Sequence, residues 1–306
     1  MHTWRLSVFR GEIMPKEFKT INEQIDLLKS RGLTISDDVL EEAKQFLAKN
    51  NYYRVSGYTL TLRDHDVFYP GTTFQNVMDI YHFDSELRNM LLWAIEIIEV
   101  NIKSRYAYLF SRDYGGLGYM DPSNFTDYDS YISLIAKVNK SITTRLNQEA
   151  YLQHYIKDLK EPLPIWAYVD LFTMTDISKL YKISSESLKK TIAAEYGLTH
   201  NRASEVLTNY LHCVTIIRNL CAHDSRLFNR LFITKPDLNK KELKLLNKKN
   251  NQPENDKLFS YILVIRRMLI EDEFSVFKSK LTALCAEYPF VGMKHYGFCP
   301  DWEKLI

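Results

Sequence analysis

The longest amphipathic stretch in the sequence runs from Thr73 to about Phe110, and it constrains the fold more than any other feature. Its apolar residues recur every three or four positions, which is the spacing of one buried helix face. They are Leu87, Met90, Leu91, Ala94, Ile95, Ile98, Ile102 and Leu109. Only 10 glycines and 9 prolines occur in 306 residues, which also favours long helices over many short strands. We therefore predict an all-α bundle.

Helix-start signals divide the rest of the chain. Thr20 and Glu23 form the pattern of a capping box, and Ser36 precedes a second amphipathic stretch. Further helices are expected over residues 128–159, 165–181, 185–196 and 258–269, the last continuing through Phe274 and Leu284. We expect residues 1–15 to be a loose N-terminal extension, 16–70 an N-terminal helical subdomain, and 71–306 the main helical domain.

The cysteines and the hydropathy of the chain indicate the cellular compartment in which the protein is expected to reside. The four cysteines show no paired spacing and no secretory signal precedes them, so we expect a reduced, cytoplasmic protein. The most apolar long run, residues 87–102, is interrupted by Glu96 and Glu99 and is too short to span a bilayer. We expect no contact with a membrane.

The stretch from Leu207 to Arg230 carries the strongest candidate site. Its apolar residues fit one buried helix face, which leads directly into Arg218, Asn219 and His223. Histidine transfers protons near neutral pH, and the arginine fork fits two phosphate oxygens. Together they suit cleavage of RNA by its own 2′-hydroxyl. An arginine and a histidine five apart also occur by chance on basic helices, so this spacing alone does not define a catalytic site.

Positive charge surrounds that stretch. Residues 201–250 hold ten Lys or Arg and four Asp or Glu, a net charge of +6, which suits a partner rich in phosphate. If the helix continues to Arg230, then Asn219, His223, Arg226 and Arg230 lie on one stripe. Both arginines, with Lys240, Lys241, Lys248 and Lys249, are candidate RNA contacts. Most lysine runs of this kind are solvated loops.

Two other groups are weaker candidates. In the stretch from Asn51 to Tyr58, Arg54 is interleaved with Tyr52, Tyr53 and Tyr58, so the rings either stack on bases or pack the first two helices. Glu96 and Glu99 either belong to a solvated helix surface, where Glu99 pairs with Lys103, or orient Arg218.

Metal and cofactor sites are not indicated. His212, Cys213, Cys221 and His223 are zinc-ligand types, but they lack the short paired spacing of a structural site. Cys221 lies on the apolar helix face, which favours packing over nucleophilic chemistry. No Walker loop or dinucleotide fingerprint is present. We expect no metal and no cofactor.

Several stretches together resemble the AbiD/AbiF group of bacterial abortive-infection proteins. They are KTINEQIDLLKSRGL from Lys19, NYYRVSGY from Asn51, YHFDSELRNMLLWAIEIIEVNIKSR from Tyr81, PIWAYVDLFTM from Pro164, IIRNLCAHDSRLFNR from Ile216 and YGFCPDW from Tyr296. The resemblance runs from about Lys16 to the C-terminal end. This group is similar to the HEPN superfamily of helical bundles, whose motif is Arg, a polar residue, variable positions and His; Arg218, Asn219 and His223 match it.

The resemblance implies a metal-independent endoribonuclease that leaves a 2′,3′-cyclic phosphate. It further implies a homodimer with one motif from each chain, and binding to a structured non-coding RNA. The activity would serve phage defence or act as a toxin. Two alternatives from other classes remain: a non-catalytic RNA-binding module that uses the same residues as a phosphate clamp, and a protein-binding helical scaffold.

Overall fold

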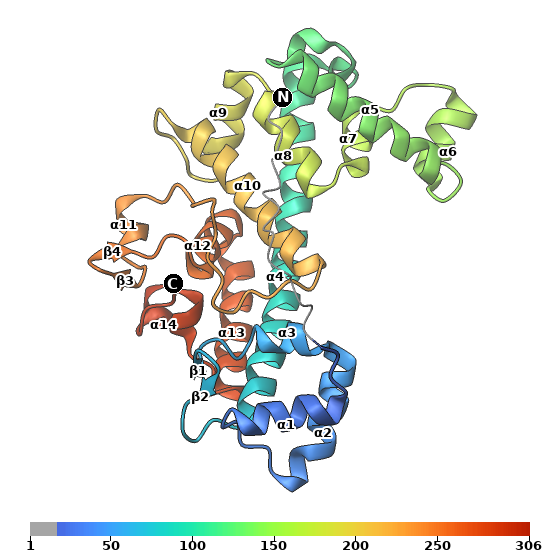
Figure 1. Cartoon of the computed structure of the whole chain (residues 1–306). Coiled ribbons are helices and arrows are strands. Elements are labelled where there is room, and N and C mark those ends of the chain that lie inside the picture. The colour runs from blue at the N-terminus through green and yellow to red at the C-terminus, as the bar shows by residue number, and fades with distance from the viewer. Residues whose placement is uncertain (1–16) are drawn as a thin grey trace, which may run out of the picture. The chain divides into compact units, whose positions relative to one another are not determined.

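The computed structural model describes residues 17–306, and the all-α prediction is confirmed (Figure 1). The predicted extension over residues 1–15 lies outside the described residues. By compactness the chain divides at Met78 and Asp79, within the long helix α4 (Phe74–Tyr114). No helix in the described part of the chain is long and apolar enough to cross a membrane.

The described part of the first unit, residues 17–78, contains three complete helices and a small hairpin, followed by the start of α4. These are α1 (Ile21–Ser30), α2 (Asp37–Asn50), α3 (Tyr52–Ser56), β1 (Arg63–Asp64) and β2 (Val67–Phe68). The predicted capping box is confirmed, because the Thr20 hydroxyl accepts from the Glu23 amide and the Glu23 carboxylate accepts from the Thr20 amide. These two bonds satisfy amides that the first helical turn leaves without partners.

The second unit, residues 79–306, continues along α4. Seven of the eight residues of the predicted apolar stripe are buried, and Met90 is half-buried. The other elements are η1 (Gly118–Met120), η2 (Pro122–Asn124), α5 (Tyr128–Arg145), α6 (Ala150–Gln153), the π-helix η3 (His154–Leu159), α7 (Ile165–Tyr168), η4 (Val169–Leu171), α8 (Met174–Ile183), α9 (Glu186–Glu195), α10 (Ala203–Ala222), α11 (Lys240–Leu243), β3 (Lys248–Lys249), β4 (Gln252–Pro253), α12 (Leu258–Met268), α13 (Glu271–Glu287), η5 (Met293–Tyr296) and α14 (Trp302–Leu305).

Helix α10 lies at the centre of this unit, packed against α8, α9 and α12 (Figure 1). It is 20 residues long, and the residues that face its neighbours are almost completely buried, including Leu207, Leu211 and Ile217. The Thr215 hydroxyl donates to the Leu211 carbonyl, one turn earlier. Burial on three sides fixes α10, so its exposed side presents residues in defined positions.

Three of the predicted helices are divided in the structure. The stretch 165–181 breaks before α8 because Thr173 and Asp176 form a capping box there. The stretch 128–159 divides into α5, α6 and η3. The expected continuation of 258–269 to Leu284 is two helices, since Leu269 and Ile270 are extended and the Glu273 carboxylate caps the Ile270 amide. Local caps therefore override the apolar periodicity.

Candidate functional site

The exposed side of α10 carries the predicted motif. His212, Ile216, Asn219 and His223 follow one another at helical spacing, and His212 and His223 are exposed while Ile216 and Asn219 are half-buried. Arg218 is half-buried beside this stripe, and its Nη1 lies 3.4 Å from the Asn219 Oδ1 that accepts its hydrogen bond. The three motif residues therefore reach solvent at the last turn of a helix whose other sides are covered.

The helix ends at Ala222, so the predicted continuation to Arg230 is wrong. Asp224 adopts a left-handed conformation with φ of 51°, and its amide donates to the Cys221 carbonyl at 3.1 Å. The Ser225 amide donates to the Leu220 carbonyl at 2.8 Å. This pair of bonds is a Schellman motif, in which aspartate occupies the position that usually holds glycine.

His223 is the cap residue of this ending. Its amide donates to the Asn219 carbonyl at 3.1 Å, which keeps the two residues one turn apart. Within residues 17–306, no hydrogen bond connects the His223 imidazole to Arg218 or Asn219. An exposed imidazole and a nearby guanidinium can still act together on a phosphate that lies between them.

The loop after His223 is held by a buried carboxylate, Asp84 of α4. One Asp84 oxygen accepts from the Phe228 amide at 2.8 Å and from the Tyr296 hydroxyl at 2.9 Å. The other accepts from the Leu227 amide at 3.0 Å and from Arg88 Nη1 at 2.7 Å. Four donors therefore converge on a carboxylate with no exposed surface. We call Asp84 and these partners the Asp84 anchor.

Sequence reasoning missed the Asp84 anchor. Asp84 and Arg88 are four apart in a mainly apolar stretch, so they resemble an ordinary surface ion pair. Their burial, at 0% and 2% exposure, marks them as exceptional, because charged side chains are almost never fully buried unless paired. Arg88 Nε also lies 3.7 Å from the carboxylate of Asp224, the residue after His223. This ion pair connects α4 to the end of α10.

The C-terminal segment completes the anchor around Phe228. The Phe228 ring meets the rings of Tyr296 at 5.6 Å and His295 at 5.1 Å between centroids. Burial lowers the pKa of His295, and the nearby Lys294 and Lys257 add to this effect. The chain turns directly afterwards at Gly297, whose φ is +88°.

Gly297→Ala is expected to destabilise the protein. An added Cβ would lie 2.4 Å from Lys257 Cβ at a backbone conformation that alanine disfavours. The positive φ costs about 1–2 kcal/mol, and overpacking adds about 1–3 kcal/mol. Chemical denaturation measures the loss. Gly115→Ala is the control, because Gly115 has φ of +77° with no atom within 4 Å of the added Cβ. An equal loss in both variants would contradict the predicted clash.

Arg226 and Arg230 do not share the helical stripe. Arg226 Nη1 donates to the Phe228 carbonyl at 2.5 Å, and Arg230 Nε donates to the Arg226 carbonyl at 2.8 Å. Both side chains are half-buried and brace the loop that the Asp84 anchor holds. Contact with RNA stays a prediction for both.

The basic segment forms a defined structure. Asn239 caps the short helix α11, and the buried Glu242 accepts from Arg267 at 2.6 Å. The strands β3 and β4 pair around Asn250 and Asn251, both with positive φ, as a two-residue hairpin turn requires. Lys240, Lys241, Lys248 and Lys249 are all exposed. An isolated bridge between Leu246 and Phe298 ties this segment to the C-terminal segment of the Asp84 anchor.

The tyrosines around Arg54, in the first unit, differ in their exposure to solvent. Tyr58 is completely buried, which agrees with the packing alternative, whereas Tyr53 is 86% exposed. Tyr52 is half-buried, and its hydroxyl accepts from Arg31 at 3.4 Å. Arg54 is half-buried as well. Packing therefore accounts for Tyr58 and leaves Tyr53 as an exposed ring.

Glu96 and Glu99 of α4 belong to a solvated helix surface, which is one of the two alternatives predicted for them. The Glu99 carboxylate accepts from Lys103 at 2.7 Å, as expected for a pair one turn apart, and Glu96 is exposed. Across residues 17–306, neither glutamate forms a hydrogen bond or ion pair with Arg218. The buried acid near the motif is Asp84 instead.

Cys221 packs in the core, as predicted. It is 3% exposed, and burial raises the pKa of its thiol to about 12. Such a thiol is almost entirely protonated near neutral pH and is a poor nucleophile. In the described part of the chain, no three His, Cys, Asp or Glu side chains are grouped so that they could hold a metal ion.

Fold and site together define a class: a helical bundle whose central helix ends in a solvent-facing arginine, asparagine and histidine set. A protein-family model described as Abi-like protein matches residues 45–229, which is more than half of the chain. The chain therefore belongs to this abortive-infection family. The match includes Asp84, Arg88 and the complete motif. Searches of curated proteins and of solved structures found no match.

Proposed function

We propose that the chain is an AbiD/AbiF-like member of the HEPN superfamily and cleaves RNA without a metal, in phage defence or as a toxin. One observation carries the proposal. His223 is exposed at the end of α10, with Arg218 and Asn219 one turn earlier, and the following loop is fixed by the Asp84 anchor. A fixed end of α10 favours catalysis, because it limits the rearrangement that the catalytic side chains must undergo.

The proposed reaction is an internal transesterification. The 2′-oxygen loses its proton and forms a bond to the adjacent phosphorus, while the bond from phosphorus to the 5′-oxygen breaks and that oxygen gains a proton. His223 performs one of the two proton transfers. Arg218 stabilises charge on the phosphorane, and Asn219 orients the pair. The products are a 2′,3′-cyclic phosphate and a free 5′-hydroxyl.

A homodimer fits this chemistry. Each chain offers one His223, whereas the reaction needs a proton acceptor and a proton donor. A second copy with its own Arg218, Asn219 and His223 would supply the missing partner. We propose a cytoplasmic homodimer whose activity is controlled by a structured non-coding RNA that it binds. The exposed lysines of the basic segment support an RNA partner.

Direct analysis of the cut ends tests the proposed function. RNA that co-purifies with the protein is sequenced, and a purified labelled RNA is incubated with the protein in the presence of a chelator. We expect fragments with 2′,3′-cyclic phosphate and 5′-hydroxyl ends. Binding without cleavage in any condition would favour the non-catalytic RNA-binding module instead. If the protein neither binds nor cleaves RNA, the protein-binding scaffold is favoured instead.

Lys248→Ala combined with Lys249→Ala is expected to weaken RNA binding. Each lysine that contacts a phosphate releases counterions, so its loss lowers the salt dependence of affinity by about 0.7–0.9 in the log–log slope. Binding titrations at several salt concentrations measure both quantities. The control is Lys29→Ala with Lys49→Ala, which removes two exposed lysines of the first unit. Equal effects of both double variants would show that net charge, rather than the hairpin, determines affinity.

A further inference from the structure

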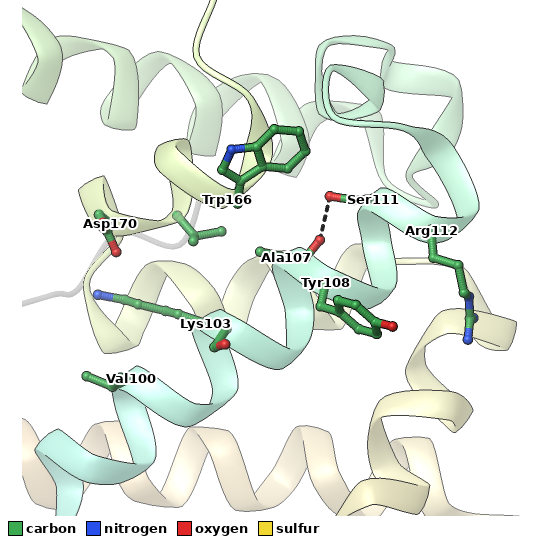
Figure 2. A pocket seen from close by; sticks show the side chains of 10 residues that line it. Val100, Lys103, Ala107, Tyr108, Ser111, Arg112, Trp166 and Asp170 are labelled. Atoms are coloured by element: carbon green, nitrogen blue, oxygen red, sulfur yellow. Dashed lines mark hydrogen bonds between the residues drawn. The ribbon is translucent and has the colours of Figure 1, made fainter. Parts of the chain in front are cut away.

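A second surface lies on the same long helix as the Asp84 anchor. It is a groove of about 730 Å³ between α4 and the turn formed by α7 and η4 (Figure 2). Val100, Ala107 and Tyr108 of α4 contribute to it, with Trp166 and Asp170 from the opposite side. Ala107 follows Asp84 by roughly 35 Å along the helix axis at 1.5 Å per residue. We call this surface the α4–α7 groove.

Two aromatic rings are presented to solvent in the α4–α7 groove. Trp166 is 57% exposed and Tyr108 is 73% exposed. One edge of the indole packs close to Gly116, because a Cβ added there would lie 2.9 Å from two of its ring atoms. The Ile165 amide also donates to the Gly116 carbonyl at 2.7 Å. A large aromatic ring that packs along one edge and is exposed elsewhere is typical of a recognition site.

The cations that line the α4–α7 groove are already neutralised within the chain. Lys103 donates to Glu99 at 2.7 Å, and Arg112 forms two hydrogen bonds to Asp113, at 2.7 and 3.0 Å. These pairs leave little positive charge for an outside ligand.

Asp170, an acidic residue that lines the groove, is not paired as those cations are. Its carboxylate is exposed and, among the described residues, has no hydrogen bond or ion pair. Lys103 and Arg112 are each neutralised by an acidic partner. The only formal charge left unpaired among the residues that line the groove is therefore the negative charge of Asp170. A polyanion such as RNA would be repelled here, and a cation would be attracted.

We infer that the α4–α7 groove docks a partner protein through a lysine or arginine side chain. The cation lies against the face of Trp166 and pairs with Asp170, while an adjoining apolar side chain covers Val100 and Ala107. Aromatic faces attract cations, and carboxylates bind them through charge-assisted hydrogen bonds. This surface is separate from the proposed ribonuclease site and gives the protein a second type of partner.

Selection from a random peptide library on the immobilised full-length chain tests the inference. We expect enriched peptides to place Lys or Arg beside an apolar residue. Their affinity should fall about tenfold for Trp166→Ala and for Asp170→Asn, the scale of an interface hot spot. Tyr128→Ala, which removes a 62% exposed ring outside the groove, should leave peptide affinity unchanged. Thermal melting checks that each variant is folded.

Two outcomes would overturn the inference. The first is a selection that yields no peptides whose binding depends on Trp166 and Asp170. The second is a loss of RNA affinity in Trp166→Ala without basic peptides being enriched, which would make the α4–α7 groove an RNA surface. Cleavage by Trp166→Ala and Asp170→Asn should match that of the unmodified chain. Failure of the proposed ribonuclease activity would therefore not affect the result of the peptide selection.

Discussion

Arg218→Ala and His223→Ala are each expected to abolish detectable RNA cleavage while the protein stays folded. Loss of a general acid or base lowers a rate by about 10²–10⁴-fold, and loss of a group that stabilises transition-state charge lowers it by about 10²–10³-fold. Neither side chain is fully buried, so stability should change little. Initial rates on a labelled RNA, with melting curves of the same preparations, measure both effects.

His212→Ala is the matched control, because His212 is also exposed on α10 but lies 11 residues before His223. It should cleave at the rate of the unmodified chain. Arg218→Lys separates charge from shape, since lysine keeps the charge and loses the planar fork. We expect it to remain strongly impaired. Full cleavage by both purified alanine variants would reject the catalytic assignment of the motif.

Asp84→Asn is expected to cause the largest loss of stability. The amide keeps one acceptor, but its NH2 group faces donors, and the buried Arg88 loses its counter-charge. Removing one partner of a buried ion pair costs about 3–5 kcal/mol, because the remaining charge is uncompensated. Urea unfolding, followed by circular dichroism, measures the change in free energy of unfolding.

A graded set of variants shows whether the charge is the cause. Tyr296→Phe removes one neutral donor from the Asp84 anchor and should cost about 1 kcal/mol. Adding Arg88→Met to Asp84→Asn removes the uncompensated charge and should restore part of the lost stability. A loss below about 1 kcal/mol in Asp84→Asn itself would contradict a dominant role for the buried carboxylate.

Periodicity and caps predicted most of the fold. The stripe of α4, the capping box at Thr20 and the helix after Ser36 are present as expected. Errors arose where a local hydrogen bond outweighs apolar spacing, as at Thr173, which divides a predicted helix. Such caps use common polar residues, so their strength is difficult to judge from sequence.

The candidate site was predictable only in its local part. Arg218, Asn219 and His223 are adjacent in sequence and follow an amphipathic helix, so their grouping was visible. The Asp84 anchor was not, because two of the three segments that it joins are distant in sequence from Asp84 and only burial distinguishes Asp84 from a surface acid. The end of α10 was misjudged because Asp224 adopts a left-handed conformation without glycine. Asp224 followed by Ser225 was a weak signal for it, since aspartate tolerates that conformation.

The hydrogen bond between Asp84 and Tyr296 connects residues 212 positions apart, and this has a consequence during protein synthesis. Translation adds roughly 5–20 residues per second. A ribosome therefore makes His223 several seconds before it makes Tyr296. During that interval the loop beyond His223 lacks one of its supports, and a product terminated early never acquires it.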